Sequence, residues 1–122
     1  MSLADIRRDY LGEPLGETES DPDPFAQFQR WFEQARTLEP DPTAMVLATA
    51  SREGRPSART VLLKGFDARG LVFYTNYDSR KAREMAETGR ASLVFYWRTL
   101  ERQVRVDGIV EKASADEADP YF

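Results

Sequence analysis

Four cationic side chains are spaced so that they could bind an anion such as phosphate. Arg59 and Lys64 bracket an apolar segment, and Arg80 and Lys81 follow Ser79 at the start of a predicted helix. A helix start offers unpaired N–H groups and a positive dipole end to an anion, and cations placed there are unfavourable without one. The spacing therefore favours a phosphate site. Two alternatives stay open, namely solvated surface bases and an Arg59 that pairs with a carboxylate across a sheet.

Aromatic and amide side chains near these cations could bind a flat ligand. Tyr74 and Thr75 come shortly before the helix that begins near Arg80, and the amide of Gln103 can both donate and accept hydrogen bonds. Aromatic rings in a small β-protein are more often core residues than ligand contacts. The residue types alone leave both interpretations open.

The 122 residues contain no His and no Cys. Their absence excludes a Ser-His-Asp triad, a thiolate nucleophile, a disulfide framework and a metal site built on either residue. Any chemistry must use Arg, Lys, Tyr, carboxylates or a bound cofactor. No apolar run approaches the roughly 20 residues of a membrane-spanning helix, and we expect no secretory signal from the start of the chain.

Charge is distributed unevenly along the sequence. Residues 1–42 carry a net charge of −6, residues 43–112 carry +5 and residues 113–122 carry −3, within a total of −4. A basic centre between acidic ends is compatible with a nucleic acid, a phosphorylated ligand or a solvated surface without a partner.

Hydrophobic periodicity and turn residues predict a mainly β chain with peripheral helices. Asp23 and Pro24 form a helix start, Gly89 is a helix stop, and Ser114 with Glu117 forms a capping box. The predicted helices cover 24–38 and 79–88 and begin again at Ser114, and the predicted strands cover 45–50, 57–66, 71–77, 91–97 and 103–112. Without βαβ repetition, five closely spaced strands indicate a small antiparallel barrel.

The second strand and the N-terminal segment complete the expected organisation. Residues 11–24 are rich in Gly, Pro and acidic residues. We expect residues 1–23 to be a mobile arm and residues 24–122 to be one domain, truncated at its C-terminus. Alternation in the second strand predicts one face with Arg59, Val61 and Leu63 and the other with Thr60, Leu62 and Lys64.

Five motifs occur in order along the chain, with Asp41-Pro-Thr-Ala-Met upstream of them: Arg59-Thr-Val-Leu-Leu-Lys-Gly, Val72-Phe-Tyr-Thr-Asn, Ser79-Arg-Lys-Ala, Phe95-Tyr-Trp and Leu100-Glu-Arg-Gln-Val-Arg. Together they closely resemble the FMN-dependent pyridoxamine 5′-phosphate oxidases over nearly the whole chain. The resemblance implies a split β-barrel, a cytoplasmic homodimer and FMN at the dimer interface. It also implies oxidation of pyridoxamine or pyridoxine 5′-phosphate to pyridoxal 5′-phosphate by O2, which gives H2O2, as part of vitamin B6 metabolism.

The same resemblance implies roles for individual residues. It assigns FMN contacts to Arg59, Thr60, Val61, Leu62, Leu63, Lys64, Tyr74, Thr75, Arg80, Lys81 and Gln103. Among these, Arg59, Arg80 and Lys81 would hold the phosphate and ribityl end of the flavin. Lys64 and Tyr121 would bind the substrate phosphate, and Arg7 through Tyr10 would belong to a segment that covers the site. No catalytic residue is assigned, because the flavin carries the redox step.

The family pattern continues past Phe122, with further residues for the substrate and for the partner's FMN. We therefore expect the 122 residues to be the N-terminal part of a longer enzyme, with the barrel truncated at its C-terminus. The alternative is a module that binds FMN or phosphate without turnover. A third hypothesis, a platform for single-stranded nucleic acid on the basic centre, is opposed by the acidic N-terminal segment.

Overall fold

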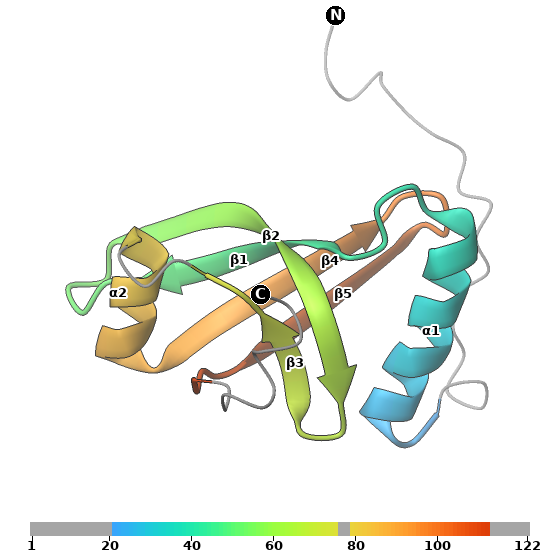
Figure 1. Cartoon of the computed structure of the whole chain (residues 1–122), viewed down its shortest axis with the longest axis horizontal. Coiled ribbons are helices and arrows are strands. Elements are labelled where there is room, and N and C mark those ends of the chain that lie inside the picture. Colours follow the sequence, from blue (N-terminus) through green and yellow to red (C-terminus); the bar gives the residue numbers. More distant parts are fainter. Residues whose placement is uncertain (1–20, 76–78, 113–122) are drawn as a thin grey trace, which may run out of the picture.

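Five antiparallel strands form one sheet in the order β3–β2–β1–β4–β5. The computed structural model describes residues 21–75 and 79–112. The strands are β1 (Ala44–Ala50), β2 (Pro56–Asp67), β3 (Gly70–Phe73), β4 (Arg90–Trp97) and β5 (Arg102–Ile109). The sheet curls into an open half-barrel accompanied by α1 (Pro24–Leu38) and α2 (Arg80–Thr88) (Figure 1). The predicted antiparallel, mainly β fold is confirmed.

Both helices begin, and α2 also ends, at signals found in the sequence. The side chain of Asp23 accepts a hydrogen bond from the backbone N–H of Phe25 at 3.0 Å, and Ser79 accepts from that of Ala82 at 3.2 Å. Gly89 ends α2 with a φ of 70°, a left-handed conformation that favours glycine. Local capping chemistry therefore fixed these boundaries.

The helices pack near opposite ends of the inner face of the sheet (Figure 1). On α1, Phe28, Phe32 and Ala35 are buried, and the ring of Phe28 meets that of Phe66 edge to face at 4.9 Å. The full core consists of Phe28, Phe32, Ala35, Met45, Leu47, Leu63, Met85, Leu93, Phe95 and Trp97. Aromatic rings thus concentrate beneath α1.

The last apolar residue of α1 lies outside the core. Leu38 is the last helical residue and is 55% exposed. The next residue, Glu39, is buried instead, because its carboxylate accepts the backbone N–H groups of Thr99 and Leu100 at 3.0 and 2.7 Å. The chain turns at the end of the helix, so that a polar side chain takes the inward position.

Strand β2 shows the predicted alternation. Its inward positions Arg59, Val61 and Leu63 are half-buried or buried, and its outward positions Thr60, Leu62 and Lys64 are exposed. The pairing with β3 shifts between Leu63 and Gly65, as at a β-bulge, and Phe66 is the residue that packs against α1. An irregularity of this kind redirects a side chain without ending the strand.

Two predicted strands are shorter in the structure. The strand predicted over 71–77 ends at Phe73, because β3 pairs only with β2 and its last partner there is Leu63. The strand predicted over 103–112 ends at Ile109, which pairs with Arg90, the first residue of β4. Predictions on Arg7, Tyr10, Tyr121, the residues of the arm before Asp21 and the helix from Ser114 fall outside the described residues.

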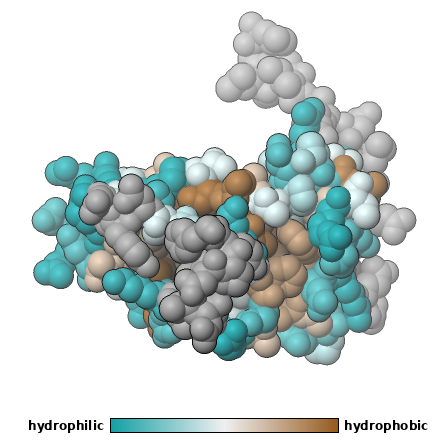
Figure 2. Space-filling model, viewed as in Figure 1, coloured by the Kyte–Doolittle hydropathy of each residue, from teal (hydrophilic) through white to brown (hydrophobic). Residues whose placement is uncertain are grey.

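Hydrophobic and hydrophilic residues are separated along the visible surface. Figure 2 shows apolar residues over β2 and beside α1, while the end that carries α2 is mostly hydrophilic. Within the described residues, no helix is both long and apolar enough to cross a bilayer.

Candidate functional site

Five polar residues from three elements meet beneath α2. We call them the arginine cluster, which consists of Thr49 on β1, Ser57 and Arg59 on β2, and Arg80 and Glu84 on α2. Thr49 and Ser57 are direct partners in the β1–β2 register, and Glu84 follows Arg80 by one helical turn. The antiparallel register and the helical repeat therefore bring these side chains together.

Arg59 is held on the inner face by three hydrogen bonds. Its Nη1 donates to the backbone oxygen of Leu47 at 3.0 Å and to Oγ1 of Thr49 at 2.9 Å, and its Nη2 donates to Oγ of Ser57 at 2.6 Å. The same Nη2 lies 3.9 Å from Oε1 of Glu84. Arg59 does pair with a carboxylate, but that carboxylate comes from a helix rather than from a neighbouring strand.

Glu84 is the buried anion of the cluster, with only 4% of its surface exposed. Its Oε1 accepts hydrogen bonds from Ser57 and Thr49 at 2.6 and 2.7 Å, and its Oε2 accepts from Nε of Arg80 at 3.2 Å. These donors, the Ser57 hydroxyl first, lower the pKa of Glu84 to about 2 although burial opposes the shift. The carboxylate is therefore charged at neutral pH.

The two arginines keep donors that no described residue uses. A guanidinium has five N–H donors. Arg80 spends one on Glu84, and Arg59 spends three on its neighbours. Lys81, half-buried, follows Arg80 on the first turn of α2. This donor set suits a phosphate, which is bound best by arginine forks near a helix start.

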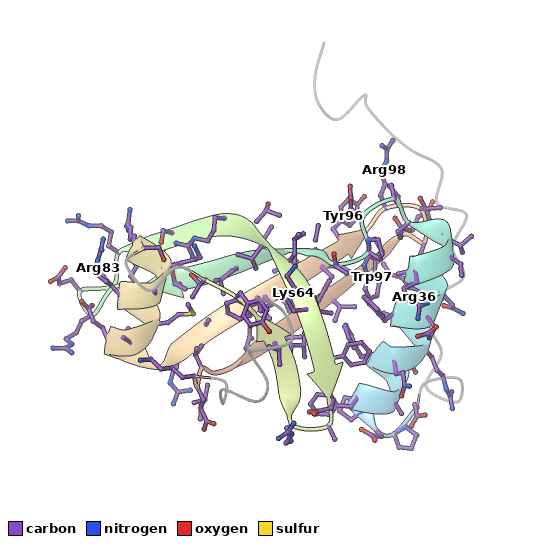
Figure 3. All side chains as sticks on the ribbon, viewed as in Figure 1. Arg36, Lys64, Arg83, Tyr96, Trp97 and Arg98 are labelled. Atoms are coloured by element: carbon purple, nitrogen blue, oxygen red, sulfur yellow. The ribbon has the colours of Figure 1, made fainter. Side chains whose placement is uncertain are left out.

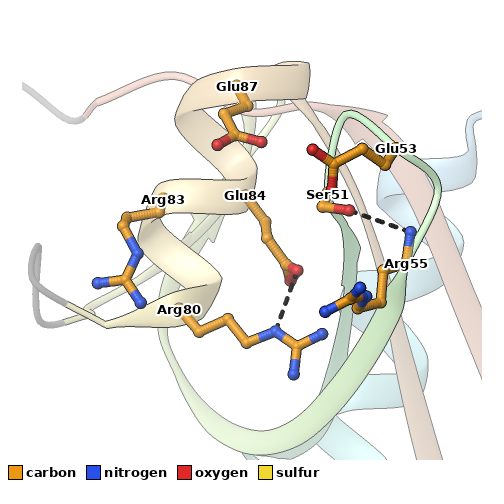
Figure 4. A pocket seen from close by; sticks show the side chains of 7 residues that line it. All are labelled: Ser51, Glu53, Arg55, Arg80, Arg83, Glu84 and Glu87. Atoms are coloured by element: carbon orange, nitrogen blue, oxygen red, sulfur yellow. Dashed lines mark hydrogen bonds and ion pairs between the residues drawn. The ribbon is translucent and has the colours of Figure 1, made fainter.

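An open pocket of about 350 Å³ lies beside the cluster, between α2 and the β1–β2 turn (Figure 4). It is lined by Ser51, Glu53, Arg55, Arg80, Arg83, Glu84 and Glu87. Its three arginines are matched by three glutamates, and Arg80 reaches from α2 toward the strands. The pocket gives solvent access to the side of the cluster on which Arg80 lies.

The remaining predicted strand contacts lie on the outer face of the sheet. Thr60, Leu62, Lys64 and Gln103 are exposed, and Gln103 pairs with outward-facing Tyr96 in the β4–β5 register. Lys64 projects from β2 between the two helices in the view of Figure 3. Strands β2 and β5 are three strand spacings apart, or about 14 Å. The structure therefore does not bring Gln103 to the arginine cluster.

Two further predicted contacts follow β3. Tyr74 and Thr75 are half-buried, and Oγ1 of Thr75 lies 3.4 Å from Oγ of Ser79, the N-cap of α2. The hydroxyl of Thr75 is therefore next to the helix start that carries Arg80 and Lys81. Val61 packs against the core and Leu63 is buried in it, so their side chains serve the interior.

The sequence interpretation missed Thr49, Ser57 and Glu84. The four-residue spacing of Arg80 and Glu84 was a signal for a pair on one helix face. It could not show that Glu84 is buried against two strand hydroxyls, because that depends on how α2 packs on β1. The cationic first turn of α2 thus has an anion within the chain itself.

Known proteins share both the sequence and the fold. A sequence model of the family described as "Pyridoxamine 5′-phosphate oxidase" matches residues 31–122. Pyridoxine/pyridoxamine 5′-phosphate oxidases from Trichormus variabilis and Rubrobacter xylanophilus are 57% and 59% identical, over 99% and 98% of the chain. The chain spans only 57% and 56% of these curated relatives.

Solved structures support the same relationship. PhzG from Burkholderia lata, solved with tetrahydrophenazine-1-carboxylic acid, matches with a TM-score of 0.81 and 34% identity, over 89% of this chain and 55% of that one. A pyridoxamine 5′-phosphate oxidase-related, FMN-binding protein from Nostoc punctiforme matches with a TM-score of 0.62 and 25% identity, over 82% and 54%. The half-barrel is therefore that of FMN-binding split-barrel proteins, and the chain belongs to the pyridoxamine 5′-phosphate oxidase family.

Proposed function

We propose that this chain binds FMN and contributes the flavin-binding part of a pyridoxine/pyridoxamine 5′-phosphate oxidase. The reaction converts pyridoxine 5′-phosphate and O2 to pyridoxal 5′-phosphate and H2O2. The oxidation of pyridoxamine 5′-phosphate gives the same two products, and it additionally consumes one water molecule and releases ammonia. A bound FMN would supply the redox chemistry, a two-electron oxidation of the substrate with O2 as the final acceptor. The partners of the proposal are thus the B6 phosphate esters, O2 and a second copy of the chain.

The observation that carries this proposal is the arginine cluster with its unused donors. Hydrogen bonds already hold the guanidinium groups of Arg59 and Arg80 in place. The two side chains therefore lose little conformational freedom when they bind an anion. In the proposal, they and Lys81 bind the flavin phosphate beside the start of α2. Thr75 lies next to the same helix start through Ser79.

Lys64 has a different proposed role. Its ammonium is on an exposed outward position of β2, whereas Arg59 lies on the inner face of the same strand. A lysine acts as a flexible point charge and suits a substrate phosphate that must enter and leave. One strand would thus serve cofactor and substrate phosphates from opposite faces.

The first test measures flavin binding directly. The purified chain is titrated with FMN, and flavin fluorescence and visible absorption report the bound fraction. Arg80→Ala combined with Lys81→Ala is expected to weaken FMN affinity by at least about tenfold, because charge-assisted hydrogen bonds are lost. Arg36→Ala on α1, whose partner is the exposed Glu33, is the matched control. Equal affinity in the double variant and the control would reject the proposed phosphate site.

A second candidate function is an FMN-binding module without turnover. It is favoured by the share of the relatives that this chain spans, 57% for the Trichormus variabilis oxidase. Incubation with FMN, pyridoxine 5′-phosphate and O2 separates the candidates. Formation of both H2O2 and pyridoxal 5′-phosphate supports the oxidase, and flavin binding without either product supports the module.

The outer face of the sheet supports a homodimer. Val46 and Leu62 are 40% and 49% exposed on adjacent strands, and Tyr96 is 60% exposed on β4. Apolar side chains gathered on one face are typical of an interface. Sedimentation velocity should show a dimer for the native chain and a monomer for Val46→Glu. A native monomer would remove this part of the proposal, together with a flavin site shared between two copies of the chain.

A further inference from the structure

Glu84 connects the two arginines of the cluster. It lies on α2, whereas its hydroxyl partners Thr49 and Ser57 lie on β1 and β2. It is nearly fully buried, and every hydrogen bond it accepts through its carboxylate comes from a residue of the cluster. A buried carboxylate can be paired with a single cation. Glu84 instead spans Arg59 on β2 and Arg80 on α2, at 3.9 and 3.2 Å.

The atoms used on Arg80 show which of its donors stay available. Glu84 takes the Nε–H, so both terminal nitrogens of the guanidinium keep their hydrogens unused by described residues. Two terminal nitrogens form the fork that binds two oxygens of one phosphate. The contact with Glu84 also directs Arg80 back toward β2, on which Arg59 lies. An Arg80 without it would be a solvated side chain with many rotamers.

Arg59 depends on Glu84 indirectly. Thr49 and Ser57 each accept a hydrogen bond from Arg59 and donate their own hydroxyl hydrogen to Oε1 of Glu84. The carboxylate therefore fixes the direction of both hydroxyl groups, and these present their oxygen lone pairs to the guanidinium. Removing the charge of Glu84 would weaken the acceptor that fixes both hydroxyls, because a neutral amide oxygen accepts less strongly than a carboxylate.

We propose that Glu84 is a positioning residue that orders Arg59 and Arg80 as one receptor for the phosphate of a flavin mononucleotide. This inference rests on the proposed function and adds to it a residue that touches only the arginines and hydroxyls, and not the ligand. The carboxylate lowers the net charge of the site, but it holds the fork of Arg80 and the remaining donors of Arg59 in place before the ligand arrives. Binding is then stronger, because the two arginine side chains lose less conformational entropy when the ligand binds.

The test compares FMN with riboflavin, which has the same ring and ribityl chain but no phosphate. In Glu84→Gln the side chain keeps its size and loses its charge. We expect its dissociation constant for FMN to rise roughly tenfold to a hundredfold, the range for a lost hydrogen bond to a charged group, and that for riboflavin to stay within about twofold. Glu33→Gln on α1, an exposed carboxylate that pairs with Arg36 away from the pocket, is the matched control.

Each outcome has a separate meaning. An equal loss for FMN and riboflavin shows a purely structural role, and a gain in FMN affinity shows that Glu84 competes with phosphate for Arg80; either result overturns the inference. A native chain that binds no FMN rejects the proposed function and the inference with it. If Glu84→Gln does not fold, Ser57→Ala removes one hydrogen bond from Glu84 and one from Arg59, and a phosphate-specific loss is again required.

Discussion

The two helices cover the same face of the sheet, but they are attached to it by different chemistry. Beneath α1, Phe28 and Phe32 pack against Phe66, Phe95 and Trp97, with ring centres 4.9 to 6.3 Å apart. Beneath α2, Met85 reaches the core, and beside it a carboxylate, two hydroxyls and two guanidinium groups form a polar contact with the strands. One end of the molecule excludes water, and the other holds charge.

This difference separates stability from function. Burying aromatic rings is the largest favourable contribution available to a small domain. A buried ionic network contributes little net stability, because desolvation offsets most of the attraction. Such a network is useful where charged groups have to be held in place for a ligand. We therefore expect substitutions beneath α1 to change unfolding and substitutions beneath α2 to change binding.

The largest effect is expected for Phe28→Ala. Phe28 contacts four other aromatic rings of the core, and its removal leaves a cavity that should cost about 3–5 kcal/mol of unfolding free energy. Urea unfolding measures this loss. Under conditions in which the variant is folded, its ratio of FMN to riboflavin affinity should equal that of the native chain. A changed ratio would show that the two ends are coupled.

Glu39→Gln tests whether the contrast is simply one of polar against apolar groups. Glu39 is also a buried carboxylate, yet it accepts backbone N–H groups of the β4–β5 turn. An amide presents N–H to one of these donors, so a loss of about 1–3 kcal/mol is expected. Flavin affinity should not change. A selective loss of FMN affinity would contradict the assignment of binding to the α2 end.

The helix caps should behave alike at both ends. Asp23→Ala and Ser79→Ala each remove one side-chain acceptor of a backbone N–H, and each should cost about 1 kcal/mol. Thermal unfolding compares the two variants. Ser79→Ala should also weaken FMN binding if the start of α2 contributes to the phosphate site, and Asp23→Ala is its control. Equal FMN affinities would restrict the site to the arginine side chains.

The smallest effect is expected for the pH dependence of stability, to which the carboxylate of Glu84 contributes only in acid. Its pKa is lowered from 4.5 to about 2 in the folded chain, so the charged form is favoured by folding. The contribution is complete above pH 4.5 and is lost as the pH falls from there through about 2. Urea midpoints should therefore fall more steeply over this range in the native chain than in Glu84→Gln. Parallel profiles would show that the carboxylate is not stabilised by its neighbours.

Local rules predicted much of the fold because its signals are local. Asp23, Ser79 and Gly89 act through their own backbone and the next turn, and the alternation of β2 follows from the pleat alone. The ends of strands were harder to predict from the sequence, because Phe73 and Ile109 end their strands where the partner strand ends or changes. The last residue of a strand depends on how far its partner strand extends, and the sequence of one segment does not encode that.

The candidate site shows the same division. Residue type and spacing identified Arg59, Arg80 and Lys81 as an anion-binding group. The inner location of Arg59 and the outer location of Gln103 depend on strand order and register, which place them on opposite faces. Glu84 was missed because its four-residue spacing from Arg80 is also common on solvated helices. Only the packing of α2 on β1 distinguishes the two cases.

The strand order also has a consequence for how the chain folds. The pairs β1–β2, β2–β3 and β4–β5 are hairpins with short turns, whereas β1 and β4 pair Val46 with Val94 across the whole of β2, β3 and α2. Local hairpins form in microseconds, and closing a long loop is slow because its entropy is lost before contacts compensate. We therefore expect the pairing of β1 with β4 to limit the folding rate, and the same pairing completes the strand surface beneath both helices.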